Sequence, residues 1–193
     1  HASIVGVPQF LPSYGGPLIR KEIEHLSKIF SPSHPFIFIL GGAKFDTKLP
    51  LVTKFLEKAD TVFIGGALSN DIFKKQGFEV GTSVVSPHPV DLTAVCASPK
   101  ILIPTDVLVN TPATAPKQSH QVLATDRILD AGPQTILDLK KALTGAKFVL
   151  WNGPLGDYEK GFSQSSVELA KAIIASGAYS VVGGGDTLAV LGK

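Results

Sequence analysis

Short apolar runs rich in β-branched and aromatic residues recur along this chain and predict buried strands. Each run is only a few residues long and is apolar on both of its faces, a pattern typical of strands in a parallel sheet that is covered on both sides. The runs lie at residues 36–40, 61–64, 101–103 with an extension toward 109, 148–151 and 180–182.

Before the first of these runs and between them, apolar residues recur at helical spacing. In the first such segment Ile23, Leu26 and Ile29 fall on one face, which indicates an amphipathic helix. The predicted helices lie at residues 19–30, 49–56, 91–97, 135–143 and 167–174. Alternating strands and helices imply right-handed βαβ units. We therefore predict a doubly wound, Rossmann-like α/β fold, in which a parallel sheet lies between two layers of helices. Residues 110–120, rich in Thr, Pro and Ala, are expected to form a surface loop.

Charge and composition narrow the partners of the chain. Its 193 residues carry 18 Lys and Arg against 16 Asp and Glu, a net charge of only +2, and the basic residues are scattered. We therefore expect no nucleic-acid partner and no anionic membrane surface. Cys96 is the single cysteine, and no apolar run approaches a membrane span. These features favour a reducing, cytoplasmic compartment.

Four of the predicted strands are followed by glycine. The turns are Gly41-Gly42, Gly65-Gly66, Asn152-Gly153-Pro154 and Gly183-Gly184-Gly185. In an open α/β sheet the ligand crevice lies outside the carboxyl ends of the strands, and glycine lets backbone N–H groups approach an anionic ligand. Any one of these turns could need glycine for steric reasons alone, but four at one edge favour a ligand site.

Two lysines follow the first of these turns. Lys44 and Lys48 are one helical turn apart and share a face, which suits a row of phosphates, although an amphipathic surface helix with two solvated lysines gives the same spacing. The segment is not a Walker A loop, because Thr47 and Leu49 stand where that motif needs Gly and Ser or Thr. No G-x-G-x-x-G occurs either, so a P-loop NTPase and a dinucleotide oxidoreductase are disfavoured.

Three further polar residues lie just beyond strand ends. Asp186 follows three glycines, where its carboxylate could meet Mg²⁺ carried on nucleotide phosphates or could simply cap a helix. Asn152 places an amide at a strand end. Glu159, seven residues on, could accept hydrogen bonds from ribose hydroxyls or could be an ordinary surface charge. H-E-x-x-H, C-x-x-C and G-x-S-x-G are absent, so zinc and serine hydrolase chemistry lack support.

Five segments in this order resemble the C-terminal, nucleotide-binding domain of phosphoglycerate kinases. They are GGAKFDTKL, FIGGAL, LDAGPQT, WNGPLGDYE and VVGGGDT, and residues 1–26 resemble the connecting stretch and interdomain helix of that family. The resemblance implies a connecting segment and interdomain helix at 1–30 and a nucleotide-binding domain at 31–193, cut short at its C-terminal end. It also implies that the N-terminal substrate domain is missing, that the full-length protein is a monomer, and that the exposed apolar face of the first helix favours self-association of this piece.

The resemblance also assigns roles to individual residues. Lys44, Gly184 and Gly185 would contact the transferred phosphoryl group as catalytic residues, and Asp186 would hold Mg²⁺. The residues implied to bind ADP or ATP are Gly41, Gly42, Ala43, Lys48, Gly65, Gly66, Leu129, Asn152, Gly153, Pro154, Glu159, Gly183 and Thr187. The double glycines 41–42 and 65–66 would form a flat wall against adenine.

The activity implied by the resemblance is phosphoryl transfer between 1,3-bisphosphoglycerate and MgADP in glycolysis. Without the triose-phosphate-binding domain, the isolated chain is expected to be inactive. Three residues depart from the family pattern: Phe45, Asp157, and Ile128, which stands where the family usually has glycine and would narrow the base pocket. A non-catalytic nucleotide-binding or scaffold domain on the same fold is the alternative, and a Rossmann oxidoreductase is a weaker one.

Overall fold

A computed structural model describes residues 2–43, 45–110 and 113–192. The chain divides into two compact units, His1–Pro32 and Ser33–Lys193. The first unit contains α1 (Ala2–Val5), η1 (Val7–Gln9) and α2 (Pro17–Ser27). Helix α2 buries none of its residues, and Ile19, Ile23 and Leu26 on its apolar face are exposed. Self-association through this face stays a prediction.

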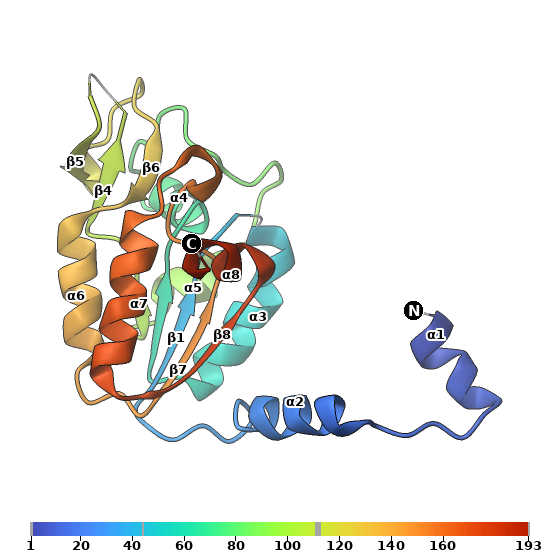
Figure 1. Cartoon of the computed structure of the whole chain (residues 1–193). Coiled ribbons are helices and arrows are strands. Elements are labelled where there is room, and N and C mark those ends of the chain that lie inside the picture. The colour runs from blue at the N-terminus through green and yellow to red at the C-terminus, as the bar shows by residue number, and fades with distance from the viewer. Residues whose placement is uncertain (1, 44, 111–112, 193) are drawn as a thin grey trace. The chain divides into compact units, whose positions relative to one another are not determined.

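A five-stranded parallel sheet forms the centre of the second unit (Figure 1). Its strands are β1 (Phe36–Leu40), β2 (Thr61–Ile64), β3 (Ile101–Leu102), β7 (Phe148–Asn152) and β8 (Tyr179–Gly183), in the order β3-β2-β1-β7-β8. All neighbouring pairs are parallel. The parallel, helix-covered sheet predicted from the sequence is confirmed.

Helices cover both faces of this sheet (Figure 1). Helices α6 (Pro133–Leu143) and α7 (Gln164–Ser176) pack over Ile37, Ile39 and Trp151 through Leu139 and Leu169. On the opposite face α3 (Phe45–Lys58) presents Phe55, whose ring centroid lies 5.8 Å from that of Phe36 and 4.3 Å from that of Phe38. The alternate residues of the all-apolar β1 strand therefore enter two different cores. The other helices of this unit are α4 (Leu68–Lys75), α5 (Thr93–Ala97), η2 (Ser119–Gln121), η3 (Tyr158–Lys160) and α8 (Gly185–Leu191).

A second, antiparallel sheet corrects part of the sequence-based prediction. It consists of β4 (Asp106–Val109), β5 (Ala115–Gln118) and β6 (Ile128–Ala131), in the order β5-β4-β6. The expected single strand from 101 toward 109 is wrong: β3 ends at Leu102, and the chain enters another sheet after Pro104, which has no N–H to donate to a ladder. The expected loop at 110–120 contains the edge strand β5, where Pro116 is tolerated because an edge strand leaves part of its ladder unpaired.

Asp106 joins this second sheet to the first turn of α6. Its carboxylate accepts hydrogen bonds from the backbone N–H of Gln134 at 3.0 Å and of Thr135 at 2.7 Å. The Thr135 hydroxyl donates to the same carboxylate at 2.8 Å. Asp106 is buried, and Gly132 is needed beside it because a Cβ there would lie 2.2 Å from the carboxylate carbon. These contacts give Gly132 and Thr135 of the LDAGPQT motif a structural role that needs no ligand.

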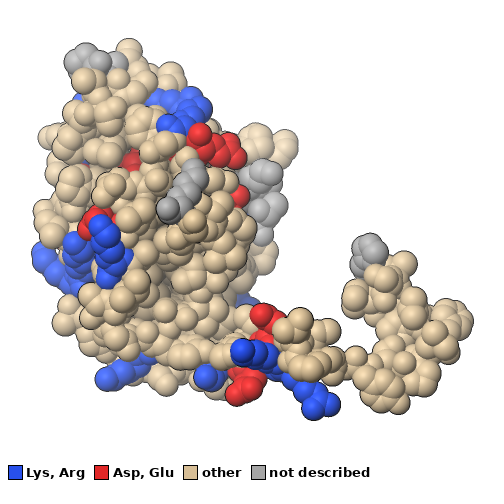
Figure 2. Space-filling model, in the orientation of Figure 1, with Lys and Arg blue, Asp and Glu red and all other residues tan. Residues whose placement is uncertain are grey.

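Charged side chains form small mixed groups on the face of the molecule shown in Figure 2, with uncharged surface between them. This distribution accords with the net charge of +2. Among the helices of the described ranges, none has both the length and the apolar character that a membrane span would need.

The strand order locates the crevice of the sheet. From β1 the chain runs outward through β2 to β3, and it later returns to the other side of β1 to form β7 and then β8. The order therefore reverses between β1 and β7, and ligands of open α/β sheets bind outside the carboxyl ends of the strands at such a point. Leu40 is paired with Asn152 at this edge, so a ligand site is expected among the residues that follow them.

Candidate functional site

Three glycine turns meet in direct backbone contact beyond β1, β2 and β7. Gly41 N–H donates to the Asn152 carbonyl at 2.8 Å, and Gly42 N–H donates to the Pro154 carbonyl at 2.8 Å. A Cβ on Gly41 would lie 2.3 Å from the Pro154 oxygen, and one on Gly66 would lie 2.6 Å from the Gly42 nitrogen. Gly42, Gly66 and Gly153 also have positive φ angles of 86°, 62° and 92°. The turns therefore need glycine to approach one another, whether or not a ligand is bound.

Buried side chains hold the third turn in place. The Trp151 indole N–H donates to the Gly153 carbonyl at 2.8 Å. Gly153 N–H donates to the Thr187 hydroxyl oxygen at 2.8 Å. The side chains of Trp151 and Thr187 are fully buried. Thr187 thus ties α8 to the turn after β7, a structural role that sequence reasoning did not foresee.

Two adjoining cavities open along these turns. The first, of about 300 Å³, is lined by residues that include Gly66, Ala67, Leu129, Pro154 and Glu159. The second, of about 250 Å³, is lined by Lys48, Asn152, Gly153, Gly184, Gly185 and Thr187. Gly42, Ala43 and Asp186 line both cavities. A ligand lying across these three residues would have one end between largely apolar walls and the other beside a cation.

Lys48 supplies that cation from the first part of α3. Its ammonium donates to the Gly41 carbonyl at 2.7 Å, and a Cβ on Gly42 would lie 2.8 Å from its Nζ. The side chain is half-buried, and this burial lowers its pKa, an effect that the charge of Asp186 opposes. A partly desolvated ammonium beside backbone amides is suited to an anion such as a phosphate.

Asp186 lies where the two cavities meet, and Tyr158 reaches it from η3. The Tyr158 hydroxyl donates to Asp186 Oδ1 at 2.9 Å, and this hydrogen bond raises the pKa of Tyr158. Within the described ranges no group of three or more His, Cys, Asp or Glu side chains is placed to hold a metal ion. A single carboxylate fits Mg²⁺ that arrives on nucleotide phosphates, because this ion is commonly held by one or two carboxylates and by the phosphates of the substrate.

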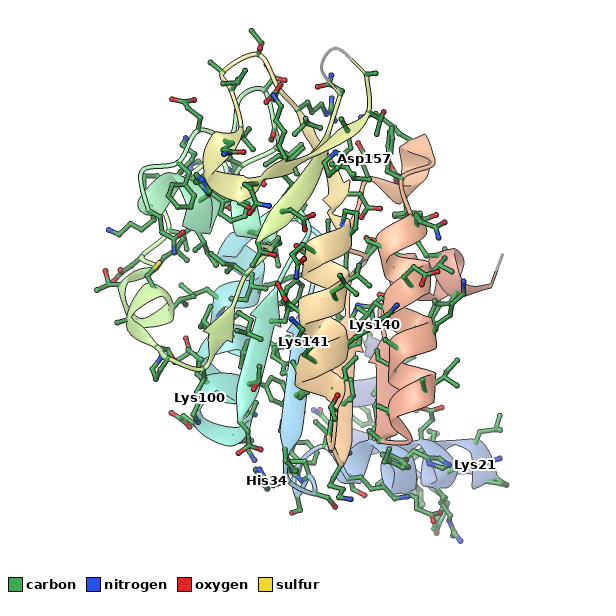
Figure 3. The ribbon with its side chains drawn as sticks, turned by 90° about the vertical axis from the view of Figure 1, so that its left-hand side faces the viewer. Lys21, His34, Lys100, Lys140, Lys141 and Asp157 are labelled. Atoms are coloured by element: carbon green, nitrogen blue, oxygen red, sulfur yellow. The ribbon has the colours of Figure 1, made fainter. Side chains whose placement is uncertain are left out.

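Asp157 organises the rim of the first cavity. Its carboxylate contacts Arg127 at 3.2 Å and Lys160 at 2.9 Å. Figure 3 shows Asp157 at the opposite end of the sheet from His34, which precedes β1 and therefore marks the amino ends of the strands. The rim thus belongs to the carboxyl edge. Ion pairs that remain partly exposed add little stability, so their main effect is to place two cations beside the entrance.

A larger hollow between α6 and α7 is a weaker candidate. It measures about 590 Å³ and is lined by Lys140, Glu168 and Lys171; Lys140 is labelled on α6 in Figure 3. Glu168 pairs with both lysines, at 3.7 Å and 2.8 Å. The charged side chains of this hollow pair with one another, and it lies away from the carboxyl ends of the strands. We therefore assign the site to the two cavities at the carboxyl edge.

Comparison with known proteins decides the family. The family model for phosphoglycerate kinase matches residues 1–193. The chain belongs to the phosphoglycerate kinase family. The phosphoglycerate kinase of Pelotomaculum thermopropionicum is 38% identical over 207 residues, which cover 100% of this chain and 52% of the relative. That of Maricaulis maris is 36% identical over 210 residues, again covering 100% of this chain and 52% of the relative.

Solved structures agree with this assignment. The phosphoglycerate kinase of Coxiella burnetii superposes with a TM-score of 0.83 at 34% identity, over 92% of this chain and 49% of the other. That of Pyrococcus horikoshii gives a TM-score of 0.82 at 30% identity, over 98% and 52%. The chain spans about half the length of the phosphoglycerate kinases it matches.

Most of the residues that the family resemblance singled out lie together at the carboxyl edge. Gly41, Gly65 and Gly183 do not line either cavity. Gly41 is buried against the Pro154 carbonyl, and a Cβ on Gly65 would lie 2.6 Å from the Phe63 ring. Gly183 is the last residue of β8 and pairs with Asn152. Lys44 lies outside the described residues.

Other lining residues were not anticipated from the sequence. They are Ala67, Asn70, Val84, Arg127, Asp130, Leu155, Gly156, Tyr158 and Lys160, while Ile128 and Asp157 were noted only as departures from the family pattern. Tyr158 directly precedes Glu159, and Asn70 lies one helical turn beyond Gly66. The spacing of four residues between Gly66 and Asn70 was therefore the one feature of the sequence that could have indicated Asn70 as a lining residue.

Asp130 is a buried carboxyl group in the wall of the first cavity. It accepts hydrogen bonds from the backbone N–H of Ala131 at 2.9 Å, from that of Ser165 at 3.2 Å and from the Ser165 hydroxyl. Gly156 must be glycine beside it, because a Cβ there would lie 2.4 Å from its Oδ1. Burial raises the pKa of Asp130 to about 6, an effect that the hydrogen bonds from Ser165 and Ala131 only partly offset.

We expect Asp130 to make stability fall as pH rises from about 4 to about 6. Its pKa is higher in the folded state than in the unfolded chain, so the folded state binds more protons in this window and loses that advantage as the pH rises. A shift of this size corresponds to about 2–3 kcal/mol. Urea unfolding of the parent and of Asp130→Asn between pH 4 and pH 7 checks this: the variant should gain about that much relative to the parent as the pH rises. Parallel pH curves would contradict the assignment.

Proposed function

We propose that this chain binds MgADP and MgATP, with the base in the first cavity and the phosphates in the second. The observation that carries the proposal is the wall of Gly42, Ala43 and Asp186 shared by two cavities at the switch point of the sheet. The first cavity has a mainly apolar surface with charged residues at its entrance, and the second contains Lys48. Glu159, which lines the first cavity, would accept hydrogen bonds from ribose hydroxyls. Asn152, Gly184, Gly185 and Lys48 would surround the phosphates.

We further propose that the site serves phosphoryl transfer between 1,3-bisphosphoglycerate and ADP, the glycolytic reaction of a phosphoglycerate kinase. Such transfer needs little covalent chemistry from the protein and depends on positioning and on neutralising negative charge. Lys48 supplies positive charge at one side, and Lys44 is expected to contact the transferred group. The acyl-phosphate substrate would be held by the half of the relatives that this chain does not cover, so the chain alone is expected to be inactive.

Asp186 is the residue we propose to hold Mg²⁺. When bound, the ion would neutralise phosphate charge and fix the geometry of the phosphate chain. Asp186 is exposed, and its carboxylate accepts a hydrogen bond from the Tyr158 hydroxyl. Its carboxylate can therefore turn toward a ligand and would lose only the hydrogen bond from the uncharged Tyr158 hydroxyl.

Removal of the Lys48 charge should weaken nucleotide binding. A charge-assisted contact contributes about 1.5–3 kcal/mol, so Lys48→Ala should raise the Kd for MgADP by about 10–100-fold in isothermal titration calorimetry. Lys54→Ala is the matched control, because Lys54 lies on the same helix, is exposed and lines neither cavity. Equal affinities of both variants and the parent would make Lys48 a structural lysine and would remove the phosphate end from the proposed site.

Substitution of Asp186 should abolish the benefit of Mg²⁺. We expect Asp186→Asn to bind ADP equally with and without Mg²⁺, whereas the parent binds more tightly with the ion. Tyr158→Phe loses the same hydrogen bond between these two side chains but keeps the carboxylate, so its Mg²⁺ dependence should survive. Calorimetry of the three proteins, each with and without Mg²⁺, checks this. A Mg²⁺ effect that persists in Asp186→Asn would place the ion elsewhere.

A further inference from the structure

Asn70 carries an unused hydrogen-bond acceptor beside the first cavity. It lies in the first turn of α4, is 2% exposed and contributes to the lining of that cavity. Its Nδ2 donates to the Val84 carbonyl at 2.8 Å. Its Oδ1 is buried and, among the residues that the structure describes, is the buried side-chain polar atom that has no partner.

The orientation of this amide is fixed by its surroundings. Rotation of the amide would place Oδ1 against the Val84 carbonyl, so that two acceptors would face each other. The segment that carries Val84 is itself held on both sides. Ser86 N–H and hydroxyl donate to Asp71 at 3.0 Å and 2.8 Å, and Ile128 N–H donates to the Ser83 hydroxyl oxygen at 2.8 Å. The Val84 carbonyl is therefore held in position, and its hydrogen bond with Nδ2 leaves Oδ1 of Asn70 as the free acceptor.

A buried acceptor without a partner has lost its hydration without compensation, and such groups are uncommon in native proteins. Asn70, Val84 and Ile128 line the first cavity but not the second, which holds Lys48. Asn70 is thus at the end of the site away from Lys48. A ligand that brings an N–H donor to this end would satisfy Oδ1, and a ligand that brings an acceptor would meet it unfavourably.

We propose that Asn70 Oδ1 accepts a hydrogen bond from an exocyclic amino group of the bound base and so selects an aminopurine over its oxo analogue. This inference rests on the proposed function, because it assumes that a nucleoside diphosphate occupies the two cavities. The role is one of specificity. Adenine carries an amino group at the position where hypoxanthine carries a carbonyl oxygen, and a site built to hydrogen-bond a donor discriminates strongly against an analogue that lacks it.

Calorimetric titration with ADP and with IDP, each with Mg²⁺, tests this specificity. The parent should bind ADP about 10–100-fold more tightly than IDP. Asn70→Leu, which keeps the size of the side chain and removes the acceptor, should lose most of this preference. Ser69→Ala is the matched control: Ser69 is equally buried on α4 and donates to the Gly66 carbonyl at 2.8 Å, but it does not line the cavity. It should change both affinities alike and keep their ratio.

The outcomes separate this inference from the proposed function. Equal binding of ADP and IDP by the parent would overturn the role of Asn70 and leave the nucleotide site standing. Retention of the full preference in Asn70→Leu would also overturn it. Failure of the parent to bind either nucleotide would overturn the proposed function and this inference with it. The comparison of the two nucleotides in the parent decides the question even if Asn70→Leu does not fold.

Discussion

The contact between the backbones that follow β1 and β7 is the constraint on which the rest of the site depends. Gly41 and Gly42 donate to the carbonyls of Asn152 and Pro154, at a distance that leaves no room for a side chain on Gly41 or Gly153. This contact continues the parallel ladder of the two strands beyond their ends. It closes the crevice at its base and joins the loop at residues 41–42 to the loop at residues 152–154, which together form one wall of the site.

This wall explains why one site has two chemically different ends. Gly42 and Gly66 leave one side of it without side chains, so the surface of the first cavity is mainly apolar, with Arg127, Asp157 and Lys160 at its rim. Lys48 reaches back over Gly42 to the Gly41 carbonyl and brings a positive charge to the second cavity. Thr187 holds the Asp186 segment against the same wall through Gly153. Apolar surface, cation and carboxylate are therefore fixed relative to one another by the same few backbone groups.

The sequence predicts the parts of this architecture that depend on local pattern. The predicted bounds of β1 match the observed ones, because its five apolar residues lie between Pro35 and Gly41, which mark the ends of the strand. The antiparallel sheet was missed, because β5 contains Pro, Lys and Gln and is defined by long-range pairing with β4. The glycine turns were found, but Gly41 and Gly65 serve packing rather than the cavity surface. Asn70 could not be recognised as a free acceptor, because that depends on Val84, which is 14 residues away along the chain.

A crystal structure of the chain with MgADP is the most direct test of the central claim that both cavities form one nucleotide site across this wall. We expect the base between Gly66 and Ile128, the phosphates beside Lys48 and Gly184, and the metal ion within coordination distance of Asp186. A nucleotide bound in the hollow between α6 and α7, or one whose phosphates enter the first cavity, would contradict the account.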